Sequence, residues 1–205
     1  MIIAVDGPAA SGKGTLARKL AQHYGLKHLD TGAIYRAIAL EVLKAGRDPG
    51  NEAAAVAAAK AYRADRFRDA ELRTEAVSRA ASIVAAFAPV RAEVVGLQRK
   101  VAHTPPGAVL DGRDIGTIVC PEAEVKFFVT ASPEERARRR VREFLARGES
   151  VEEASILAEI VQRDERDRTR HVAPLKPAAD AHLLDTTTLD IEAAFQAARR
   201  IVDGH

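Results

Sequence analysis

A glycine-rich segment near the N-terminus constrains the fold of this chain more than any other feature. Residues 7–15 have the sequence Gly-Pro-Ala-Ala-Ser-Gly-Lys-Gly-Thr, shortly after the apolar run Ile2–Val5 and before a segment whose apolar residues have helical spacing. In such a loop the glycines let several backbone N–H groups point at a phosphate group, and the helix N-terminus adds partial positive charge. The sequence therefore predicts a phosphate-binding loop, rather than an ordinary glycine turn, formed by Gly7, Pro8, Ala9, Ala10, Ser11, Gly12, Lys13, Gly14 and Thr15.

Three residues bear on the chemistry of this loop. Lys13 is placed to bridge the β- and γ-phosphates of a nucleotide. Gly14 stands where many such loops carry the serine or threonine that ligates magnesium. Adenylate kinase and its relatives have the same Gly-Lys-Gly-Thr ending, with magnesium held largely by phosphates and water. Asp111, at the end of an apolar run, is a candidate to bind that magnesium through a water, and a plain Asp-Gly turn is the alternative.

The rest of the chain alternates short apolar runs with longer segments of helical pattern. The runs are rich in β-branched residues or leucine, and they are Ile2–Val5, His28–Asp30, Ala108–Asp111, Val125–Thr130 and His182–Asp185. This alternation is typical of an α/β fold, in which helices cover a parallel sheet. A chain of 205 residues with 47% hydrophobic content can bury its core as one domain. We therefore expect a single domain over residues 1–205, with a five-stranded parallel sheet flanked by helices.

Two segments are expected to project from this core. Residues 31–106 separate two of the runs and are mostly helical by pattern, so they are predicted to form a second lobe. Ser132, followed by a proline and two glutamates, has the pattern of a helix N-terminus, and Ser150 repeats the capping pattern beyond Gly148. The two helices and their connection predict a short lid at residues 141–164. The core then comprises residues 1–30, 107–140 and 165–205.

Charge and composition exclude several classes of protein. Lys and Arg number 31 and Asp and Glu 29, so the net charge of +2 gives no field typical of a nucleic-acid or membrane-surface protein. The apolar run before Asp6 is five residues long, far too short for a signal peptide or a membrane span. The single cysteine, Cys120, rules out an internal disulfide and is expected to be a small apolar residue of the interior. We expect a cytoplasmic monomer that binds small molecules and neither nucleic acid nor membrane.

Two further segments follow predicted strands and carry arginine. Residues 30–36, Asp-Thr-Gly-Ala-Ile-Tyr-Arg, cross from a strand into a helix, where backbone N–H groups, the Thr31 hydroxyl and Arg36 can converge on an anion. Residues 111–114, Asp-Gly-Arg-Asp, set an arginine and a carboxylate side by side at the expected cleft. A second phosphate site is the functional interpretation. An ordinary capped helix start with a surface arginine is the alternative.

A third segment, residues 163–170, has the sequence Arg-Asp-Glu-Arg-Asp-Arg-Thr-Arg. Arg163, Asp167 and Arg170 are separated by four and three positions, which on a helix places them on one face toward a ligand. Residues 136–170 contain ten arginines, eight acids and no lysine, and arginine favours planar bidentate contacts with phosphate. A solvated helix with ion pairs is the alternative, and we expect it to describe some of these residues.

Taken together, these segments resemble cytidylate kinase of the bacterial type over nearly the whole length. The motifs at residues 7–15, 30–36, 111–114 and 163–170 occur in the family's order. The resemblance implies a P-loop kinase fold in which the lobe at residues 31–106 binds the monophosphate. It also implies transfer of the ATP γ-phosphoryl group to CMP or dCMP, with magnesium, giving ADP and CDP or dCDP.

Roles for individual residues also come from the resemblance. Positions at the cytosine end are Thr31, Ser82, Arg91 and Asp114, those near the acceptor phosphate are Arg36, Arg113 and Arg170, and those near the sugar are Arg163 and Asp167. A carboxylate such as Asp114 can accept from the cytosine N4 amine, and Arg91 can donate to N3 and O2. Uracil would present a carbonyl to Asp114, so this carboxylate is expected to favour cytosine.

Phosphoryl transfer needs positioning and charge more than covalent chemistry, so the lack of a compelling general base in the sequence does not count against a kinase. The loop amides, magnesium and basic side chains would hold the charge that moves in the transition state. The candidate catalytic residues are Lys13, Arg136 and Arg139, the last two chosen among Arg136, Arg138, Arg139 and Arg140.

The chain departs from the family pattern at two places. Thr31 stands where the family often has serine, and this keeps the hydroxyl. The family usually has a small β-rich insertion in its monophosphate-binding lobe, whereas Tyr62–Glu75 is short, charged and without period-two alternation. The insertion is therefore predicted to be trimmed, which bears on base selectivity and on closure.

Other functions stay open on the sequence. The nearest is a P-loop kinase of another small acceptor, such as UMP, AMP, shikimate or dephospho-coenzyme A. A nucleotide-dependent switch is disfavoured, because no Asn/Thr-Lys-x-Asp guanine-binding motif follows the strand ending at Thr130. A nucleic-acid-binding ATPase is disfavoured by the balanced charge and by aromatic residues at 4%, too few for a stacking platform.

Overall fold

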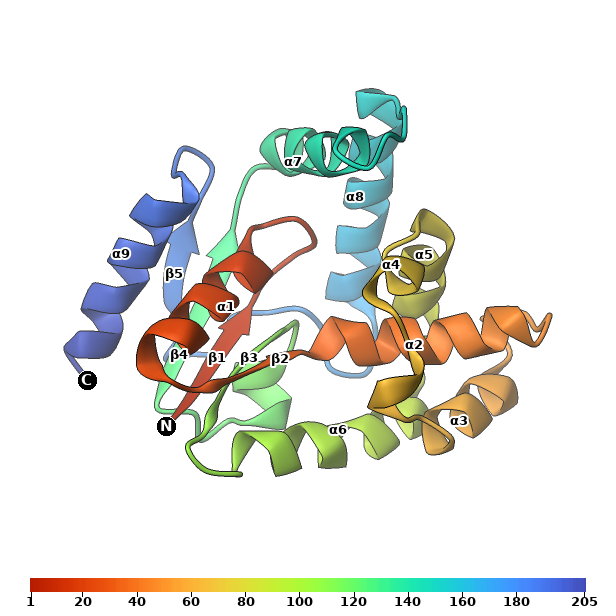
Figure 1. The fold of residues 1–205 in the computed structure, drawn as a ribbon, viewed down its shortest axis with the longest axis horizontal. Coiled ribbons are helices and arrows are strands. Elements are labelled where there is room, and N and C mark those ends of the chain that lie inside the picture. Colours follow the sequence, from red (N-terminus) through yellow and green to blue (C-terminus); the bar gives the residue numbers. More distant parts are fainter.

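A parallel sheet forms the centre of the molecule, in a computed structural model that describes the backbone of residues 1–205 and every side chain except that of Asp69. Its strands are β1 (Ile2–Asp6), β2 (Lys27–Asp30), β3 (Ala108–Gly112), β4 (Val125–Thr130) and β5 (His182–Asp185). They lie in the order β2-β3-β1-β4-β5, and all neighbours are parallel (Figure 1). Each strand coincides with an apolar run of the sequence, so the predicted five-stranded α/β fold is confirmed.

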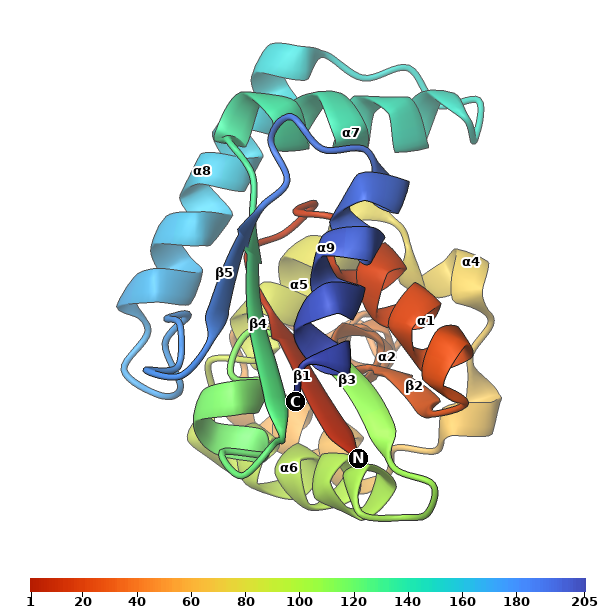
Figure 2. The ribbon, with the colours of Figure 1, turned by 90° about the vertical axis from the view of Figure 1, so that its left-hand side faces the viewer.

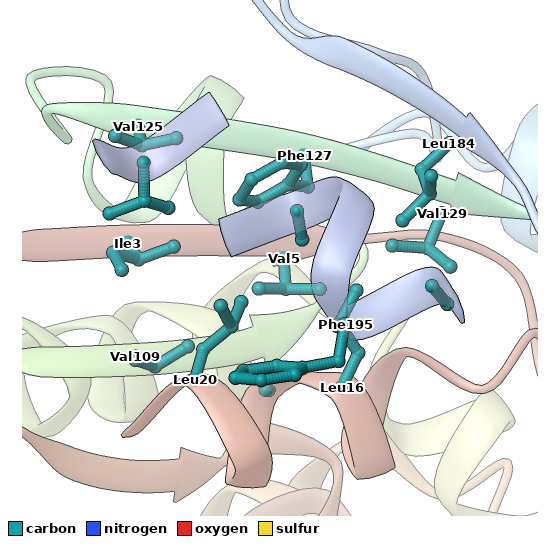
Figure 3. Close-up of a cluster of buried hydrophobic side chains, with 14 of the residues drawn as sticks. Ile3, Val5, Leu16, Leu20, Val109, Val125, Phe127, Val129, Leu184 and Phe195 are labelled. Carbon is teal, nitrogen blue, oxygen red and sulfur yellow. The ribbon is translucent and has the colours of Figure 1, made fainter. Parts of the chain in front are cut away.

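Helices α1 (Lys13–Tyr24) and α9 (Ile191–Asp203) cover one face of the sheet. Their apolar side chains pack against β1 and β4 in a cluster that includes Leu20, Phe127 and Phe195 (Figure 3). Burial of this cluster fixes α1 against β1, and the glycine loop between these two elements is thereby held at the end of the sheet.

The opposite face packs against α6 (Ala88–Ala102) and the π-helical turn η2 (Ile115–Val119). Cys120 is fully buried in this apolar cluster, and burial raises the pKa of its thiol to about 11. The thiol is therefore kept protonated and inert, as expected for a small apolar residue of the interior.

The segment between β2 and β3 forms a helical lobe. Its helices are α2 (Thr31–Lys44), α3 (Glu52–Lys60), α4 (Asp69–Leu72), α5 (Glu75–Val84) and α6, with the 3₁₀ turn η1 (Ala64–Arg66). α2 and α5 pack together around Ile38, Ala81 and Val84 in an apolar cluster of their own. This confirms that the long insertion is mostly helical. The described backbone of residues 62–75 contains no strand, as its sequence pattern indicated.

Helices α7 (Pro133–Leu145) and α8 (Glu153–Thr169) lie beyond the carboxyl ends of the strands (Figures 1 and 2). The predicted cap of α7 is confirmed, because the Ser132 hydroxyl accepts from the Glu135 N–H at 3.2 Å. The predicted start of α8 at Ser150 is wrong. Val151 packs against the α7–α8 apolar cluster from a non-helical segment, so the helix begins only at Glu153.

Among the described residues, no single helix is long and apolar enough to cross a membrane. Helices α5 and α6 reach that length and apolar character only when taken together, and the chain bends by 101° at the break between them.

Candidate active site

A cleft of about 590 Å³ lies at the carboxyl ends of β1, β2 and β3, between the helical lobe and helices α7 and α8. Every residue predicted to bind the acceptor lines it, namely Thr31, Arg36, Ser82, Arg91, Arg113, Asp114, Arg163, Asp167 and Arg170. The glycine loop contributes Ala9, Ala10, Gly12, Lys13, Gly14 and Thr15 to the same lining. The fold thus brings the four sequence motifs to one place.

The glycine loop has the backbone that a phosphate cradle needs. Gly7 has a φ of +153°, and a Cβ there would lie 2.0 Å from the Val129 carbonyl oxygen, so only glycine fits. Ala10 adopts a φ of 58°, a conformation that costs energy for a residue with a side chain. The Thr186 hydroxyl donates to the Ser11 carbonyl at 3.0 Å and ties the loop to the segment after β5. The loop is therefore held in a strained shape at the N-terminus of α1.

Lys13 crosses the inside of this loop. Its Nζ donates to the Pro8 carbonyl oxygen at 3.1 Å, and the side chain is buried. Burial and, next in size, the positive charge of Arg113 lower the pKa of Lys13 to about 7, while Asp111 acts in the opposite sense. A phosphate anion in the cleft would stabilise the charged lysine, since an opposite charge favours the ionised form.

Asp111 lies beside the loop, as predicted for a residue that binds magnesium through water. Its Oδ1 is 3.5 Å from where a Cβ on Gly14 would be, and its Oδ2 is 2.9 Å from Nε2 of His28. The described side chains contain no group of three or more His, Cys, Asp or Glu residues that could hold a metal. A single carboxylate beside a phosphate cradle fits magnesium, which keeps most of its waters and takes phosphate oxygens as ligands.

Three arginines among the acceptor-binding candidates carry buried donors without partners. Among the described residues, Nε of Arg36, Nε of Arg163 and Nη2 of Arg170 have no hydrogen-bond partner. Unpaired buried donors are costly in a folded protein, so each calls for a ligand or a water. Three such arginines in one cleft form a site for an anion.

Carboxylates balance part of this charge. Arg36 pairs with Asp30 at 2.7 Å, and Asp30 also caps α2 by accepting from the Ala33 N–H. Arg113 pairs with Asp167 at 2.9 Å rather than with the neighbouring Asp114. Burial alone would raise the pKa of Asp167, but Arg113 and Arg163 outweigh it and hold this pKa below its ordinary value.

The cleft lining also contains a buried ion pair between Arg91 and Asp114. Arg91 also donates to the Ala85 carbonyl at 3.2 Å, and its guanidinium lies 5.5 Å from the ring centroid of Tyr35. Asp114 and Arg91 thus contact each other, an arrangement that the sequence did not indicate. The Thr31 hydroxyl donates to the backbone carbonyl of Asp111 at 2.7 Å, which leaves its oxygen free to accept.

The two predicted arginines of α7 contact the loop rather than line the cleft. Arg136 is buried in a two-contact ion pair with Asp164 and donates to the Ala9 carbonyl at 3.2 Å. Arg139 donates to the Ser11 carbonyl at 3.3 Å and to Thr186. Arg140 is the arginine of this helix whose side chain lines the cleft.

Sequence reasoning missed several residues of the site. Tyr35 and Arg166 line the cleft, and both belong to motifs whose other members had been singled out. Asp6 accepts from the backbone N–H groups of Ile115 and Gly116, both at 2.8 Å, and so holds the turn that follows Asp114. Burial raises the pKa of Asp6 to about 7. The two backbone partners of Asp6 lie more than a hundred residues away, and no local pattern reveals them.

Known proteins match this chain over its length. A family described as cytidylate kinase matches residues 3–203. Relatives named cytidylate kinase, from Bradyrhizobium diazoefficiens and Nitrobacter winogradskyi, are 58% and 59% identical over 203 residues, which is 99% of this chain and 96% of theirs. A solved shikimate kinase from Bacteroides thetaiotaomicron is similar in fold, with a TM-score of 0.51 and 13% identity over 99% of this chain and 98% of that one. A gluconokinase from Sinorhizobium meliloti has the same TM-score and 12% identity, over 98% of this chain and 93% of its own.

Proposed function

This chain belongs to the cytidylate kinase family, and on this basis we propose that it transfers the γ-phosphoryl group of ATP to CMP or dCMP, giving ADP and CDP or dCDP. The structural observation that carries the proposal is a single cleft lined both by the phosphate loop and by three arginines with unpaired buried donors. Two anions can therefore lie side by side, as transfer between nucleotides requires. Membership of the family favours this reaction over the phosphorylation of AMP, UMP, shikimate or dephospho-coenzyme A.

On the donor side, the loop from Gly7 to Thr15 would hold the phosphates of ATP through its backbone N–H groups. Lys13 would bridge the β- and γ-phosphates, and Asp111 would bind a water of the magnesium ion. Magnesium, when bound, would supply positive charge that neutralises the phosphates. The neighbouring Gly14 supports this role for Asp111, because no loop hydroxyl at that position competes for the ion.

On the acceptor side, Arg36, Arg113 and Arg170 would hold the phosphate of CMP, with Arg163 and Asp167 near the sugar. The unpaired N–H groups on Arg36, Arg163 and Arg170 support this assignment. Thr31, Ser82, Arg91 and Asp114 would surround the base. The Arg91–Asp114 ion pair sets a donor group and an acceptor group next to each other, which is the pattern that the edge of cytosine needs.

For the transition state, Lys13, Arg136 and Arg139 remain our candidates for holding charge. Arg136 and Arg139 donate to loop carbonyls, which supports a role at the phosphates. Arg140 adds a further candidate, because it lines the cleft. Closure of α7 and α8 would exclude water and so prevent hydrolysis of ATP.

The reaction is tested by ADP formation from ATP with CMP, dCMP, UMP, AMP and shikimate in turn. We expect CMP or dCMP to exceed UMP by roughly one to two orders of magnitude in kcat/KM, because a mismatched polar group in a buried pocket costs about 1 to 3 kcal/mol. A higher efficiency with AMP or shikimate would contradict the proposal.

Arg36→Ala and Arg170→Ala are each expected to raise the KM of CMP by about tenfold or more, since a hydrogen bond to a charged group contributes about 1.5 to 3 kcal/mol. The KM of ATP should change by less than about twofold. Arg47→Ala is the control, because Arg47 is exposed in the helical lobe and lies outside the cleft lining. Equal changes in both Michaelis constants would assign these arginines to structure or to the donor side.

The division into a core, a monophosphate-binding lobe at residues 31–106 and a lid at residues 141–164 stays a prediction. The same holds for a monomeric state, a cytoplasmic location and the expectation that neither nucleic acid nor membrane is a partner.

A further inference from the structure

Arg166 and Arg168 are the two arginines of the 163–170 segment to which the proposed function gives no role. Arg168 is exposed and pairs with Glu165 at 3.2 Å, as a solvated helix surface requires. Arg166 instead turns toward α5, where its Nη1 donates to the hydroxyl oxygen of Ser82 at 3.0 Å. Both side chains line the cleft.

Ser82 lies in α5 with only 4% of its surface exposed. A serine inside a helix commonly donates to the backbone carbonyl four residues earlier. Among the described residues, the Ser82 side chain makes no such bond to the helix backbone, and its hydrogen bond is the one that it accepts from Arg166. A guanidinium has donors and no acceptor, so the serine oxygen accepts and the hydroxyl proton points away from the cation. That proton is free to be donated to a ligand in the cleft.

We propose that Arg166 is a positioning residue that fixes the Ser82 hydroxyl as a hydrogen-bond donor to the pyrimidine base, and thereby contributes to the choice of cytosine over uracil. This role rests on the proposed function, which puts the base at Ser82. The pairing edge of cytosine offers two adjacent acceptors, N3 and O2, whereas uracil has an N3–H donor between two carbonyl oxygens. An unrestrained hydroxyl can rotate to accept from that N3–H. A hydroxyl that already accepts from a cation is a poorer acceptor and a better donor.

The contact also joins the helical lobe to α8. Figure 1 shows α8 running beside α5, and a second contact between them pairs Arg79 with Glu159 at 3.4 Å. The orientation of the Ser82 hydroxyl therefore depends on where α8 lies. Selection of the base would therefore depend on the position of α8, the helix that also carries Arg163 and Asp167 and is followed by Arg170.

The test compares Arg166→Met, which removes the donors but keeps an apolar stem, with Arg166→Lys, which restores a cationic donor. Arg168→Met on the same helix is the matched control. In Arg166→Met we expect the ratio of CMP to UMP kcat/KM to fall by about tenfold, or about 1.4 kcal/mol. The KM of ATP should stay within about twofold. Arg166→Lys should recover part of the ratio, and Arg168→Met should keep the parent ratio.

A double-mutant cycle with Ser82→Ala separates this role from direct contact with the base. If Arg166 acts through Ser82, Arg166→Met changes the ratio no further in the Ser82→Ala background. The positioning role would be overturned if Arg166→Met lowered the ratio of CMP to UMP kcat/KM equally in the parent and in the Ser82→Ala background. It would also be overturned if Arg166→Met kept both the parent ratio and the parent melting temperature. A rise in the KM of ATP that matches the rise for CMP would indicate a structural residue instead. Failure of the proposed function is distinct, because the parent enzyme would then phosphorylate no pyrimidine monophosphate.

Discussion

Lys13→Ala is expected to lower the rate of phosphoryl transfer by about a hundredfold to a thousandfold, because removal of one preorganised donor to developing charge typically costs this much. The fold should survive. The hydrogen bond that Lys13 makes is to the Pro8 carbonyl, and burial already disfavours the charged form, so its pKa lies at about 7. The buried charge therefore contributes little to stability. The variant loses one hydrogen bond, which lowers the free energy of unfolding by about 1 kcal/mol. Single-turnover transfer at saturating ATP measures the chemical effect, and thermal unfolding measures the stability.

The matched control is Lys19→Ala. Lys19 lies on the same helix, outside the cleft lining, and pairs with Glu192 at 2.7 Å. Loss of such a surface pair costs at most about 1 kcal/mol and should leave the transfer rate unchanged. Activity of Lys13→Ala within about tenfold of the parent, about 1.4 kcal/mol in the activation barrier, would remove Lys13 from the catalytic set.

The elements of the core could be predicted because their signals are local. Strands that are buried on both faces appear as continuous apolar runs, and β4 begins and ends where the run Val125–Thr130 does. Helix α1 ends at Gly25, which adopts a φ of +65°. Helix α7 begins after Ser132, whose own side chain caps the helix by accepting from the Glu135 N–H.

The rest depended on contacts between distant residues. The start of α8 was misplaced because Val151 packs against the α7–α8 cluster, and the capping pattern at Ser150 carries no information about that packing. Arg113 stands next to Asp114 in the sequence, yet its partner is Asp167, 54 positions away. A local pattern indicates that charges are near one another, and only the fold decides which of them pair.

The same limit applies to the arginines of α7. Arg136, Arg138, Arg139 and Arg140 lie within a little more than one helical turn, so they point in different directions around the helix axis. The sequence cannot say which direction faces the cleft. In the structure Arg136 turns to Asp164, Arg139 to the loop and Arg140 to the cleft. Six of the nine predicted loop residues and all the acceptor candidates line the cleft, but the sequence did not predict how the arginines of α7 are arranged.

Asp114→Asn is expected to narrow the preference for CMP over UMP by about tenfold or more. In the ion pair with Arg91 the carboxylate accepts from the guanidinium and keeps further lone pairs for the cytosine N4 amine. An asparagine amide has one oxygen, and the buried guanidinium requires it, so the NH₂ group is left to face the base. That group can donate to the uracil O4 and opposes the cytosine N4 amine. The efficiency with CMP should therefore fall more than the efficiency with UMP.

Asp114→Asn also weakens a buried charge pair and so lowers stability by about 1 to 3 kcal/mol. The buried pair between Arg136 and Asp164 provides a control for this loss of stability. Asp164→Asn makes the same chemical change opposite Arg136, at a pair outside the cleft lining. It should lose stability and overall activity while keeping the parent ratio of CMP to UMP kcat/KM. Both ratios are measured in one coupled assay at a temperature where each variant is folded. If the ratio is the same in Asp114→Asn as in the parent, Asp114 does not contact the base, and cytosine selectivity must come from Arg91, Ser82 or Thr31.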